Sequence, residues 1–600
     1  MSAQQLTEAE SLLAAGRVED AIRLTLDALA KGDADGRGLV ILAECLLQRP
    51  DIALTDQQGR AVDALMLLLD GPAIDARSAP KQRFTWQQAI ARASSSLPRI
   101  SQEMLLDALG ASLVPPEEYL QILGVVSLRD PDWARLMRQA EQCAADGSAH
   151  PDCTDEDLDA AARQQAWLTY WRLRPNANLA IELVLTAIRR RLLEHAVIGR
   201  PLATAWQEMA ASLAVQAHLN EFVWREEETE TTWLATINGR AADTDGWLVA
   251  AMYRDAAEAQ QPLPVDLSSR GGAIADLIDF AVDAPRQRRQ IVDELPTIGT
   301  SADTITSLVR DFYETTPYPR WRHGYDISFA TPYANWLAGR FPGIAEPDFA
   351  RAPRLDLLVA GCGTGHALIN PLQYQGARIT AVDLSRSSLA YARQMVEGCG
   401  RHDVDFHHGD LRRISTLGRQ FDVVECTGVV HHMADPWEGV AALVEVLRPG
   451  GHLLLSIYSR HFRDLLQPAM RIAHAAADGR ATPREQVQAA RAAVLAGRRT
   501  IPHADLVMTM QDFFLTSDCR DLLLHPVEHP MTVHEMVTGA ARFGLQPLGL
   551  FLANPFWRLR AEQHRQAAGL APGLTAWAAF EADQPAAFDN MINLLFAKTG

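Results

Sequence analysis

One stretch decides the fold: Leu355-Asp-Leu-Leu-Val-Ala-Gly361-Cys-Gly363-Thr-Gly365-His-Ala-Leu, which is followed by Ile379-Thr-Ala-Val-Asp383. An apolar run, a glycine turn, a helix and a second apolar run that ends in a carboxylate predict a nucleotide-binding βαβ unit. The carboxyl ends of both predicted strands then lie at one edge of a parallel sheet, where open α/β sheets bind their ligands. We therefore expect an α/β, Rossmann-like domain around this stretch.

The spacing of the glycines separates two kinds of cofactor. A dinucleotide fold needs Gly-x-Gly-x-x-Gly, because its helix amides receive a pyrophosphate. Here the pattern is Gly-x-Gly-x-Gly, and His366 takes the place of the third dinucleotide glycine. This disfavours an NAD-dependent oxidoreductase and favours a ligand without phosphates. S-adenosylmethionine (SAM) fits, because its methionine end can lie over a turn without side chains while Asp383 accepts hydrogen bonds from both ribose hydroxyls.

Three later segments continue the pattern of strands with polar ends. They are Val404-Asp-Phe-His-His-Gly409-Asp410, Phe421-Asp-Val-Val-Glu-Cys-Thr-Gly428-Val-Val-His431-His432-Met and Leu447-Arg-Pro-Gly-Gly-His-Leu-Leu-Leu-Ser-Ile-Tyr458. We interpret them as the third, fourth and fifth strands of the sheet. The Asp410 carboxylate is then placed to meet the adenine amino group, and the fourth strand opens onto the same site.

These ordered motifs resemble those of the class I SAM-dependent methyltransferases, and Val429-Val-His-His-Met-Ala-Asp-Pro436 is similar to small-molecule methyltransferases of the quinone-biosynthesis type. The resemblance implies methyl transfer from SAM by a seven-stranded domain at residues 300–600, with a final antiparallel pair at 545–551 and 591–598. The residues then expected to bind the cofactor are Gly361, Cys362, Gly363, Gly365, Asp383, Leu384, Asp410, Leu411, Thr427, Tyr318 and Arg320.

A second resemblance covers nearly the whole chain and concerns bacterial class I SAM-dependent methyltransferases that carry tetratricopeptide repeats (TPRs). The matching segments are Asn220-Glu-Phe-Val, Thr316-Pro-Tyr-Pro-Arg-Trp321, Ile457-Tyr-Ser and Cys519-Arg-Asp-Leu-Leu-Leu-His-Pro-Val-Glu-His529. Two departures stand out: Thr316 replaces an asparagine of those proteins, and the repeat region is degenerate. The resemblance therefore predicts fold and reaction type, and it leaves the acceptor open.

The first half of the chain reads as helices. Apolar residues at helical spacing predict helices at 6–15, 18–31 and 38–48, and their small residues match about one and a half TPRs. An ordinary helical bundle is the alternative. We expect a degenerate TPR-like region at 1–100, an α-helical domain at 101–295 and a linker at 283–303. Because the repeat register is short, the helical half should pack on the catalytic domain and help to wall its site.

Two segments outside the strands are expected to enclose the ligands. A strap with Tyr318 and Arg320 precedes the first strand and should cross the cofactor, where Arg320 could bind a carboxylate of SAM or of the substrate; the alternative is that its aromatic residues only seal the core. The insertion at 460–535 lies above the carboxyl ends of the strands in this fold. We interpret it as a helical substrate lid with loops at 512–519 and 525–532 and with Thr532 capping the next helix.

Methyl transfer is an in-line displacement that needs alignment, exclusion of water and, for a protonated acceptor, a base. The candidate catalytic residues are His431, His432, His525, Glu528 and His529. Neutral imidazole suits proton transfer near pH 7. A histidine that only shapes the turn after the fourth strand is the alternative. Adjacent histidines without further ligand spacing do not predict a metal site.

Composition limits the function classes. The net charge of −18 argues against a nucleic-acid backbone as the main partner. The chain has no apolar run of membrane-spanning length and no signal-peptide pattern, so a cytoplasmic protein with reduced cysteines is expected. The expected function is a SAM-dependent methyltransferase acting on a small molecule, a peptide or a protein. The alternative is a SAM-binding scaffold whose helical half binds a protein partner. No oligomeric state is predicted.

Overall fold

The computed structural model describes residues 2–29, 37–49, 52–54, 123, 127–128, 130–147, 150–238, 243–258, 263–299, 303–322 and 330–599. These residues divide into two compact units. The first contains the described residues up to Leu136 and Glu156–Leu173, and the second contains the others. Among the described residues, no helix combines the length and the apolarity that crossing a lipid bilayer requires.

Helices form the described part of the chain before the sheet, as the apolar spacing predicts. They are α1 (Ser2–Ala14), α2 (Val18–Leu29), α3 (Arg37–Gln48), α9 (Pro131–Asp146), α10 (Asp155–Arg163), α11 (Gln165–Leu173), α12 (Leu179–Ile198), α13 (Thr204–Leu219), α14 (Glu228–Asn238), α15 (Thr244–Ala251), α16 (Gly272–Ile278) and α17 (Ala284–Glu294). Ala9 and Ala21 are fully buried where α1 and α2 pack. The TPR-like character stays a prediction, and its continuation through 55–100 lies outside the described residues.

An eight-stranded sheet is the core of the second unit, in the order β1-β4-β3-β2-β5-β6-β8-β7. Every neighbouring pair is parallel except those of β8, which is antiparallel to β6 and to β7. The strands are β1 (Thr297–Gly299), β2 (Leu355–Ala360), β3 (Ala377–Asp383), β4 (Asp405–Gly409), β5 (Phe421–Thr427), β6 (Leu447–Tyr458), β7 (Leu545–Phe551) and β8 (Met591–Lys598). All seven predicted strands are present.

The eighth strand, β1, corrects the predicted linker at 283–303. Thr297 pairs with His408 and Gly299 with Gly409, so β1 extends the sheet along the edge of β4. The first part of the same linker is the helix α17, whose first turn contains Pro285. A proline in the first turn costs no helical hydrogen bond, which is why Ala284-Pro-Arg begins a helix rather than a loop.

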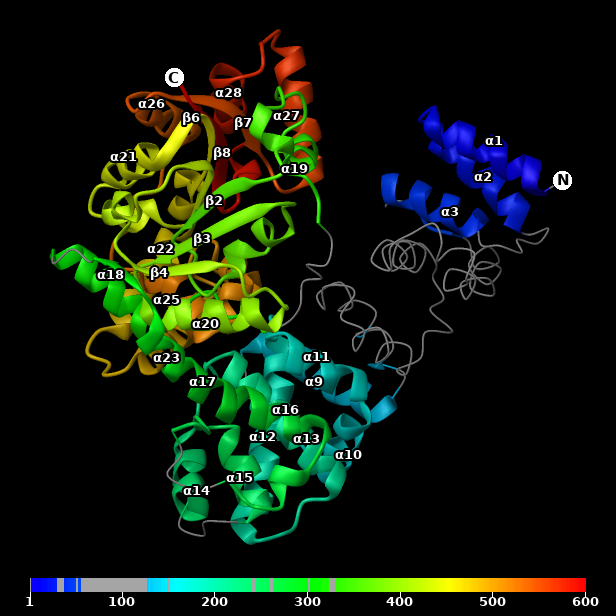
Figure 1. Ribbon diagram of the computed structural model, residues 1–600. Coiled ribbons are helices and arrows are strands. Elements are labelled where there is room, and N and C mark those ends of the chain that lie inside the picture. Colours follow the sequence, from blue (N-terminus) through cyan, green and yellow to red (C-terminus); the bar gives the residue numbers. More distant parts are fainter. Residues whose placement is uncertain are drawn as a thin grey trace. The chain divides into compact units, whose positions relative to one another are not determined.

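Further helices cover both faces of the sheet (Figure 1). They are α18 (Thr304–Thr315), α19 (Tyr333–Arg340), α20 (Arg386–Gly398), α21 (Pro436–Val446), α26 (Val533–Ala541), α27 (Pro555–Ala567) and α28 (Leu574–Asp583). Leu358 and Ala360 of β2 pack against α21, α26 and α28, whereas Leu357 and Val359 pack against α19 and α20. This alternation explains why β2 reads as a continuous apolar run: both of its faces are buried.

The βαβ unit departs from the predicted pattern between β2 and β3. In place of an α-helix, the chain makes two short 3₁₀ turns, η6 (His366–Leu368) and η7 (Pro371–Gln373). Pro371 lacks the N–H that a longer helix would use, and Gly376 adopts a φ of +70° at the entry to β3. The prediction of a helix here is therefore wrong, although both strands and the glycine turn are present.

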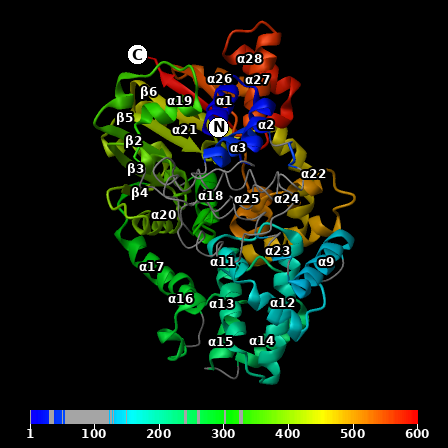
Figure 2. The ribbon, with the colours of Figure 1, turned by 90° about the vertical axis from the view of Figure 1, so that its right-hand side faces the viewer.

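The insertion between β6 and β7 is helical, as predicted for a lid. It contains α22 (Arg460–Ala477), α23 (Pro483–Ala496), α24 (Ala504–Thr509) and α25 (Thr516–Leu524). Thr532 caps α26 through a reciprocal pair of contacts with Glu535, as expected. Part of the segment predicted as loop at 512–519 instead begins α25. In two views α23 and α25 lie between the sheet and the helices α12 and α13 (Figure 1, Figure 2).

Buried polar contacts join the lid to the preceding helices. Arg491 of α23 forms an ion pair with Glu182 of α12 at 2.7 Å, with both side chains at least nine-tenths buried. Gln488 donates to the carbonyls of Phe222 (3.0 Å) and Trp224 (2.8 Å). Removing one partner of a buried ion pair leaves an uncompensated charge, so these contacts fix the two parts against each other. The helix α12 and the loop at 222–224 are thus packed on the lid helix α23.

Glu425 of β5 is a carboxyl group in the core, away from the ends of the strands. Burial raises the pKa of Glu425 from 4.5 to about 7, although Tyr374 donates a hydrogen bond to it at 3.3 Å. A raised folded-state pKa means that the native protein binds more protons than the unfolded chain between these values. Stability therefore falls as pH rises from about 4.5 to 7.

We expect Glu425→Gln to remove this pH dependence. The shift corresponds to roughly 3 kcal/mol of unfolding free energy, so the stability of the variant relative to wild type should rise by about that amount between pH 5 and pH 8. Urea denaturation at the two pH values measures it. Exposed Glu445 provides the control, because Glu445→Gln should leave the pH dependence as it is. An equal pH dependence in Glu425→Gln and wild type would show that Glu425 stays ionised.

Candidate active site

A cavity of about 290 Å³ lies at the carboxyl ends of the central strands. Its walls come from the glycine turn after β2, from the ends of β3, β4, β5 and β6, and from α18 with the strap that follows it. Nine of the eleven predicted cofactor-binding residues line this cavity: Tyr318, Gly361, Cys362, Gly363, Asp383, Leu384, Asp410, Leu411 and Thr427. Of the five predicted catalytic residues, His432 lines it.

Each glycine of the turn makes room for a different neighbour. A Cβ on Gly361 would lie 2.2 Å from Val429, one on Gly363 would lie 2.6 Å from the Tyr318 carbonyl oxygen, and one on Gly365 would lie 3.0 Å from Ala392. All three adopt positive φ values, which side chains disfavour. Gly365 therefore serves packing against α20 rather than lining the cavity. Gly363 lets the strap cross the turn, and the Thr364 amide donates to the Tyr318 carbonyl at 3.3 Å.

Replacing Gly363 with alanine should push the strap away from the turn. The added Cβ meets a backbone oxygen, which cannot rotate aside as a side chain can. We expect a loss of about 1–3 kcal/mol in unfolding free energy, together with weaker SAM binding. Gly418 is the matched control, because its φ is +62° but its Cβ would meet nothing within 4 Å. If Gly418→Ala costs as much as Gly363→Ala, backbone strain and not the strap contact is responsible.

Asp383 ends β3 beside the glycine turn. One carboxylate oxygen accepts from the Gly363 amide at 2.8 Å and the other from the Ser385 amide at 2.9 Å. These bonds hold the carboxylate against the cavity and leave a further lone pair on each oxygen. Burial raises the pKa of Asp383 from 3.8 to about 6, and the two amide contacts oppose that rise. The group can thus accept two ligand hydroxyls when it is ionised.

Asp410 occupies the next strand end, after β4. Arg412 clamps its carboxylate, with Nη2 2.6 Å and Nε 3.1 Å from its two oxygens. Arg412 also pairs with Asp303 at 2.6 Å, next to α18. This network fixes the orientation of Asp410 on the cavity wall, where it remains a prediction as the adenine contact. Sequence spacing alone does not reveal Arg412 as its partner.

The strap places Tyr318 and Arg320 differently. Tyr318 lines the cavity, and its ring stacks with Tyr313 of α18 at 6.4 Å between centroids. Arg320 does not line the cavity. Its Nε donates to the Glu221 carboxylate at 2.9 Å, in an ion pair that is more than four-fifths buried. Arg320 thus binds a carboxylate of the same chain, and the expected contact with a SAM or substrate carboxylate stays a prediction.

The tautomer of the His432 ring is defined by a hydrogen bond. His432 lies in η9 (Val430–His432), and its Nδ1 is 3.0 Å from the Val527 carbonyl oxygen. A carbonyl can only accept, so Nδ1 holds the proton and Nε2 keeps its lone pair. Burial lowers the pKa of His432 below 6.5, although Asp521 and the Val527 contact oppose the change. His432 is therefore neutral near pH 7 and ready to accept a proton through Nε2.

His525 has the opposite tautomer. The Val527 amide donates to its Nδ1 at 3.2 Å, so the ring proton lies on Nε2. The rings of His525 and His432 are 3.7 Å apart between centroids. The backbone N–H and C=O of a single residue, Val527, thus orient both histidines, and they leave one ring with a free lone pair and the other with an N–H. Burial lowers the pKa of His525 well below 6.5, so this ring is neutral as well.

Asp521 of α25 joins this cluster and was not identified from the sequence. It accepts from the Tyr313 hydroxyl at 2.6 Å and from the Tyr458 hydroxyl at 2.7 Å. Both tyrosines line the cavity. The segment that resembles the TPR-containing methyltransferases spans Asp521, but its place on a helix facing two distant tyrosines depends on tertiary packing, which local spacing does not report.

His432, Asp521 and His525 place potential ligand atoms within 4.8 Å of one another, an arrangement that could suit a metal ion. The donor set fits a metal poorly. The lone pair of His525 on Nδ1 is occupied by the Val527 amide, and its Nε2 carries the proton. Asp521 is already bonded to two hydroxyls. The cluster is therefore better suited to moving or orienting a proton than to binding a cation.

The other predicted catalytic residues lie behind or beside the cavity. His431 is fully buried, 4.3 Å from the Tyr458 ring between centroids, and neither ring nitrogen has a hydrogen-bond partner among the described residues. Its carbonyl accepts from the His529 amide at 2.8 Å. Glu528 pairs with Arg463 at 2.5 Å. Glu528 and His529 face a separate open groove beside Trp437, so the three residues support the lid rather than the cavity wall.

Comparisons with known proteins find methyltransferases that are similar to part of the chain. Residues 358–453 match a family described as a methyltransferase domain. An uncharacterized protein of Synechococcus sp. is 33% identical over 175 residues, which cover 26% of this chain and 38% of that protein. The ubiquinone biosynthesis O-methyltransferase of Aromatoleum aromaticum is 34% identical over 111 residues, which cover 18% of this chain and 47% of that enzyme. The chain thus spans less than half the length of these relatives.

Among solved structures, PKMT2 of Rickettsia typhi in complex with AdoHcy is similar over 47% of this chain and 54% of that chain, with 16% identity and a TM-score of 0.36. Residues 358–453, which match the methyltransferase-domain family, include the glycine turn, Asp383, Asp410 and His432. Over this segment the chain is similar to methyltransferases.

Proposed function

We propose that the protein is a SAM-dependent methyltransferase that acts on an acceptor with an O–H or N–H group. One observation carries this proposal: Asp383 and His432 line the same cavity, and the contact of His432 Nδ1 with the Val527 carbonyl leaves Nε2 as the acceptor atom of that ring. The first suits the ribose of SAM, and the second suits the proton that the acceptor must lose. The matched methyltransferase domain includes both residues.

In this proposal the residues divide the work. SAM, when bound, would supply an electrophilic methyl group on its sulfonium, and the neutral thioether would be the leaving group as the methyl–sulfur bond breaks. The turn at Gly361 to Gly365 and Asp383 would bind and orient it, and Asp410 would contact the adenine. His432 would take the acceptor proton through Nε2 as the acceptor bonds to the methyl carbon. Tyr313 and Tyr458, held by Asp521, shape the acceptor end of the cavity and exclude water.

Labelled SAM tests the proposal. The protein is incubated with methyl-labelled SAM and with catechol as an oxygen acceptor or a lysine-containing peptide as a nitrogen acceptor, and then with a cell lysate. Labelled product that requires the protein supports the proposal. Labelled product with the lysate but with neither catechol nor the peptide would show that the acceptor is another molecule in the lysate. SAM binding without any labelled product would instead support the SAM-binding scaffold.

If the protein is instead a SAM-binding scaffold, α1, α2 and α3 are the candidates for binding a protein partner, because they have the TPR-like spacing. Their burial pattern is that of a packed helical cluster, with Ala9, Ala21 and Leu42 inside. A TPR-like groove and a protein partner belong to this second proposal. Deleting residues 1–48 should leave methyl transfer intact if the catalytic proposal holds, and should abolish partner capture if the scaffold does.

A further inference from the structure

The loop after α13 has an unusual backbone. Glu221 and Phe222 are consecutive and both adopt left-handed φ values, +56° and +57°. Among the described residues, His503 is the one other non-glycine position with a positive φ. Side chains disfavour this conformation, so two adjacent cases persist only where surrounding contacts impose them. The loop comes from the helical half, yet its contacts lead to the candidate active site.

The Glu221 carboxylate holds two elements of the catalytic domain at once. One oxygen accepts from Arg320 of the strap at 2.9 Å, and the other accepts from the Ser517 amide at 2.6 Å. The backbone continues the same contact. Thr516 donates through its amide to the Asn220 carbonyl at 3.1 Å and through its hydroxyl to the Glu221 carbonyl at 3.0 Å.

These contacts cap α25 from outside. The residue before the helix is Leu515, which offers no side-chain cap. The first amides of any helix lack partners within it, and a carboxylate near them is favourable. Glu221 and Asn220 satisfy the Thr516 and Ser517 amides. The start of α25 is thus determined by residues almost 300 positions earlier in the chain.

Helix α25 then transmits this position to the cavity. Asp521 lies one turn after Ser517 and accepts from the hydroxyls of Tyr313 and Tyr458. His525 follows the last residue of the helix and lies against His432. A shift at the beginning of α25 would therefore move the partners of two cavity-lining tyrosines and of the base.

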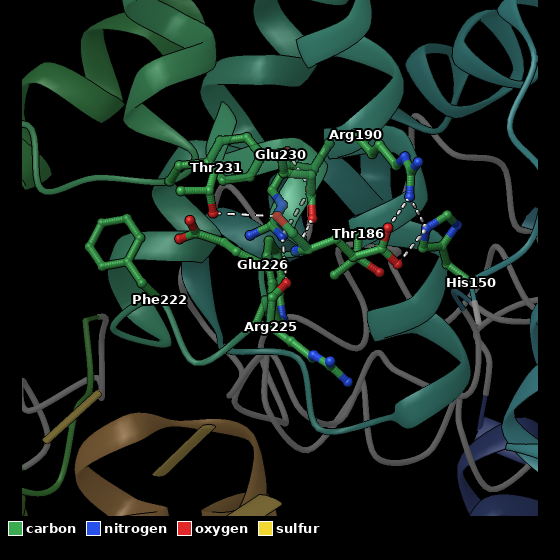
Figure 3. Close-up of polar contacts among 12 residues, drawn as sticks. His150, Thr186, Arg190, Phe222, Arg225, Glu226, Glu230 and Thr231 are labelled. Carbon is green, nitrogen blue, oxygen red and sulfur yellow. Dashed lines mark hydrogen bonds and ion pairs between the residues drawn. The ribbon is translucent and has the colours of Figure 1, made fainter. Parts of the chain in front are cut away.

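The loop itself is anchored on the helical side. Figure 3 shows the segment that runs from Phe222 past Glu226 to Glu230 and the polar contacts around it. Arg189, buried in α12, donates to the Arg225 carbonyl at 2.9 Å, and Glu230 accepts from the Glu227 amide at 2.8 Å. The segment that follows Glu221 in the loop thus has its own contacts with α12 and within the segment itself.

We propose that Glu221 is a positioning residue for methyl transfer: it sets the start of α25 and the strap, and through them the placement of Asp521, His525 and Tyr318. The inference rests on the proposed function and adds to it a role for the helical half. Glu221 touches neither the cavity nor any reacting atom, so it acts through the elements it holds. A purely structural role would cost stability without selectively lowering turnover of the folded enzyme.

The test compares Glu221→Gln with Glu228→Gln in the full-length protein. Glu228 lies seven residues later in the same segment, is exposed and has no side-chain ion pair among the described residues. Glutamine keeps the size of Glu221 but loses its charge, and its NH₂ group faces either Arg320 or the Ser517 amide, both of which are donors. Initial rates with labelled SAM and catechol, or the lysine-containing peptide if that is the acceptor, give kcat and KM. Equilibrium titration gives SAM affinity, and hydrogen exchange reports on residues 516–525.

We expect Glu221→Gln to lower kcat about 10- to 100-fold, with SAM affinity within about threefold of wild type and faster exchange in residues 516–525. Glu228→Gln should match wild type in all three. Glu221→Asp keeps the charge and should recover part of the lost kcat; it also serves if the glutamine variant does not fold.

Two outcomes would overturn the inference. They are wild-type kcat in the folded fraction of the Glu221 variants, with or without a loss of stability, and unchanged exchange in residues 516–525. Labelled product from the wild-type protein in the same assay shows that the proposed function stands in each of these cases. Absence of product from wild type with every acceptor sinks the proposed function, and the positioning role with it.

Discussion

Replacing His432 with alanine should lower turnover about 10²–10⁴-fold while leaving SAM affinity nearly unchanged. The reason is that Nε2 is the proposed base, whereas the proposed SAM contacts belong to other residues. Burial holds the pKa of His432 below 6.5, and the ring must be neutral to act. Activity of the wild type should therefore fall as pH decreases through that lowered pKa, and the alanine variant should lack this acid limb. Rates with labelled SAM across pH 5 to 8 measure both effects.

His534 provides the matched control. It is an exposed histidine on α26, so His534→Ala should keep both the rate and the acid limb. His432→Gln asks whether orientation matters without proton transfer, because its amide can bond to the Val527 carbonyl but cannot act as a base. An alanine variant within about threefold of the wild-type rate would exclude His432 as the base.

Replacing Asp383 with alanine should weaken SAM binding by about 30- to 1,000-fold. Two hydrogen bonds from the ribose hydroxyls to a carboxylate contribute roughly 2–4 kcal/mol, which corresponds to that range. Because the pKa of Asp383 is raised to about 6, wild-type affinity should also decrease as pH falls below 6, when the carboxyl binds a proton. The variant should have no such dependence. Isothermal titration at pH 5, 6 and 7.5 measures it.

Exposed Asp403, paired with Arg401 on the surface, serves as the control: Asp403→Ala should bind SAM as wild type does. Asp383→Asn should lie between wild type and alanine, because its amide offers one acceptor oxygen in place of two. SAM affinity that is equal in wild type and Asp383→Ala would remove the assignment of this cavity to SAM.

The sheet was predictable because its signals are local. The apolar runs at β2 and β3 and the glycine turn between them depend on neighbouring residues, and burial on both faces makes such runs conspicuous. Where the sequence carries competing local signals, prediction was less successful. Pro285 reads as a linker residue yet begins a helix, and Pro371 sits where a helix was expected.

The candidate site was only partly predictable from the sequence. Asp383 and His432 could be found because strand ends in this fold meet at one edge. Asp521 and Glu221 could not, since their roles arise from contacts with residues more than 60 and more than 90 positions away. Arg320 illustrates the same point: its charge was evident, but its partner on a distant loop was not. Tertiary packing, and not local propensity, decides which polar residues meet.

The backbone of Val527 has a further consequence for the proposed catalysis. An imidazole in water passes its proton freely between its two nitrogens, so an unrestrained base spends part of its time in the unreactive form. Here both rings lose that freedom only while residues 525–529 are seated, and the His529 amide on the His431 carbonyl holds them there. If this segment moved away, the protons of both rings would again exchange between Nδ1 and Nε2. The acceptor would enter while the lid is open, and the proposed base would take its reactive tautomer only when the lid closes over the acceptor.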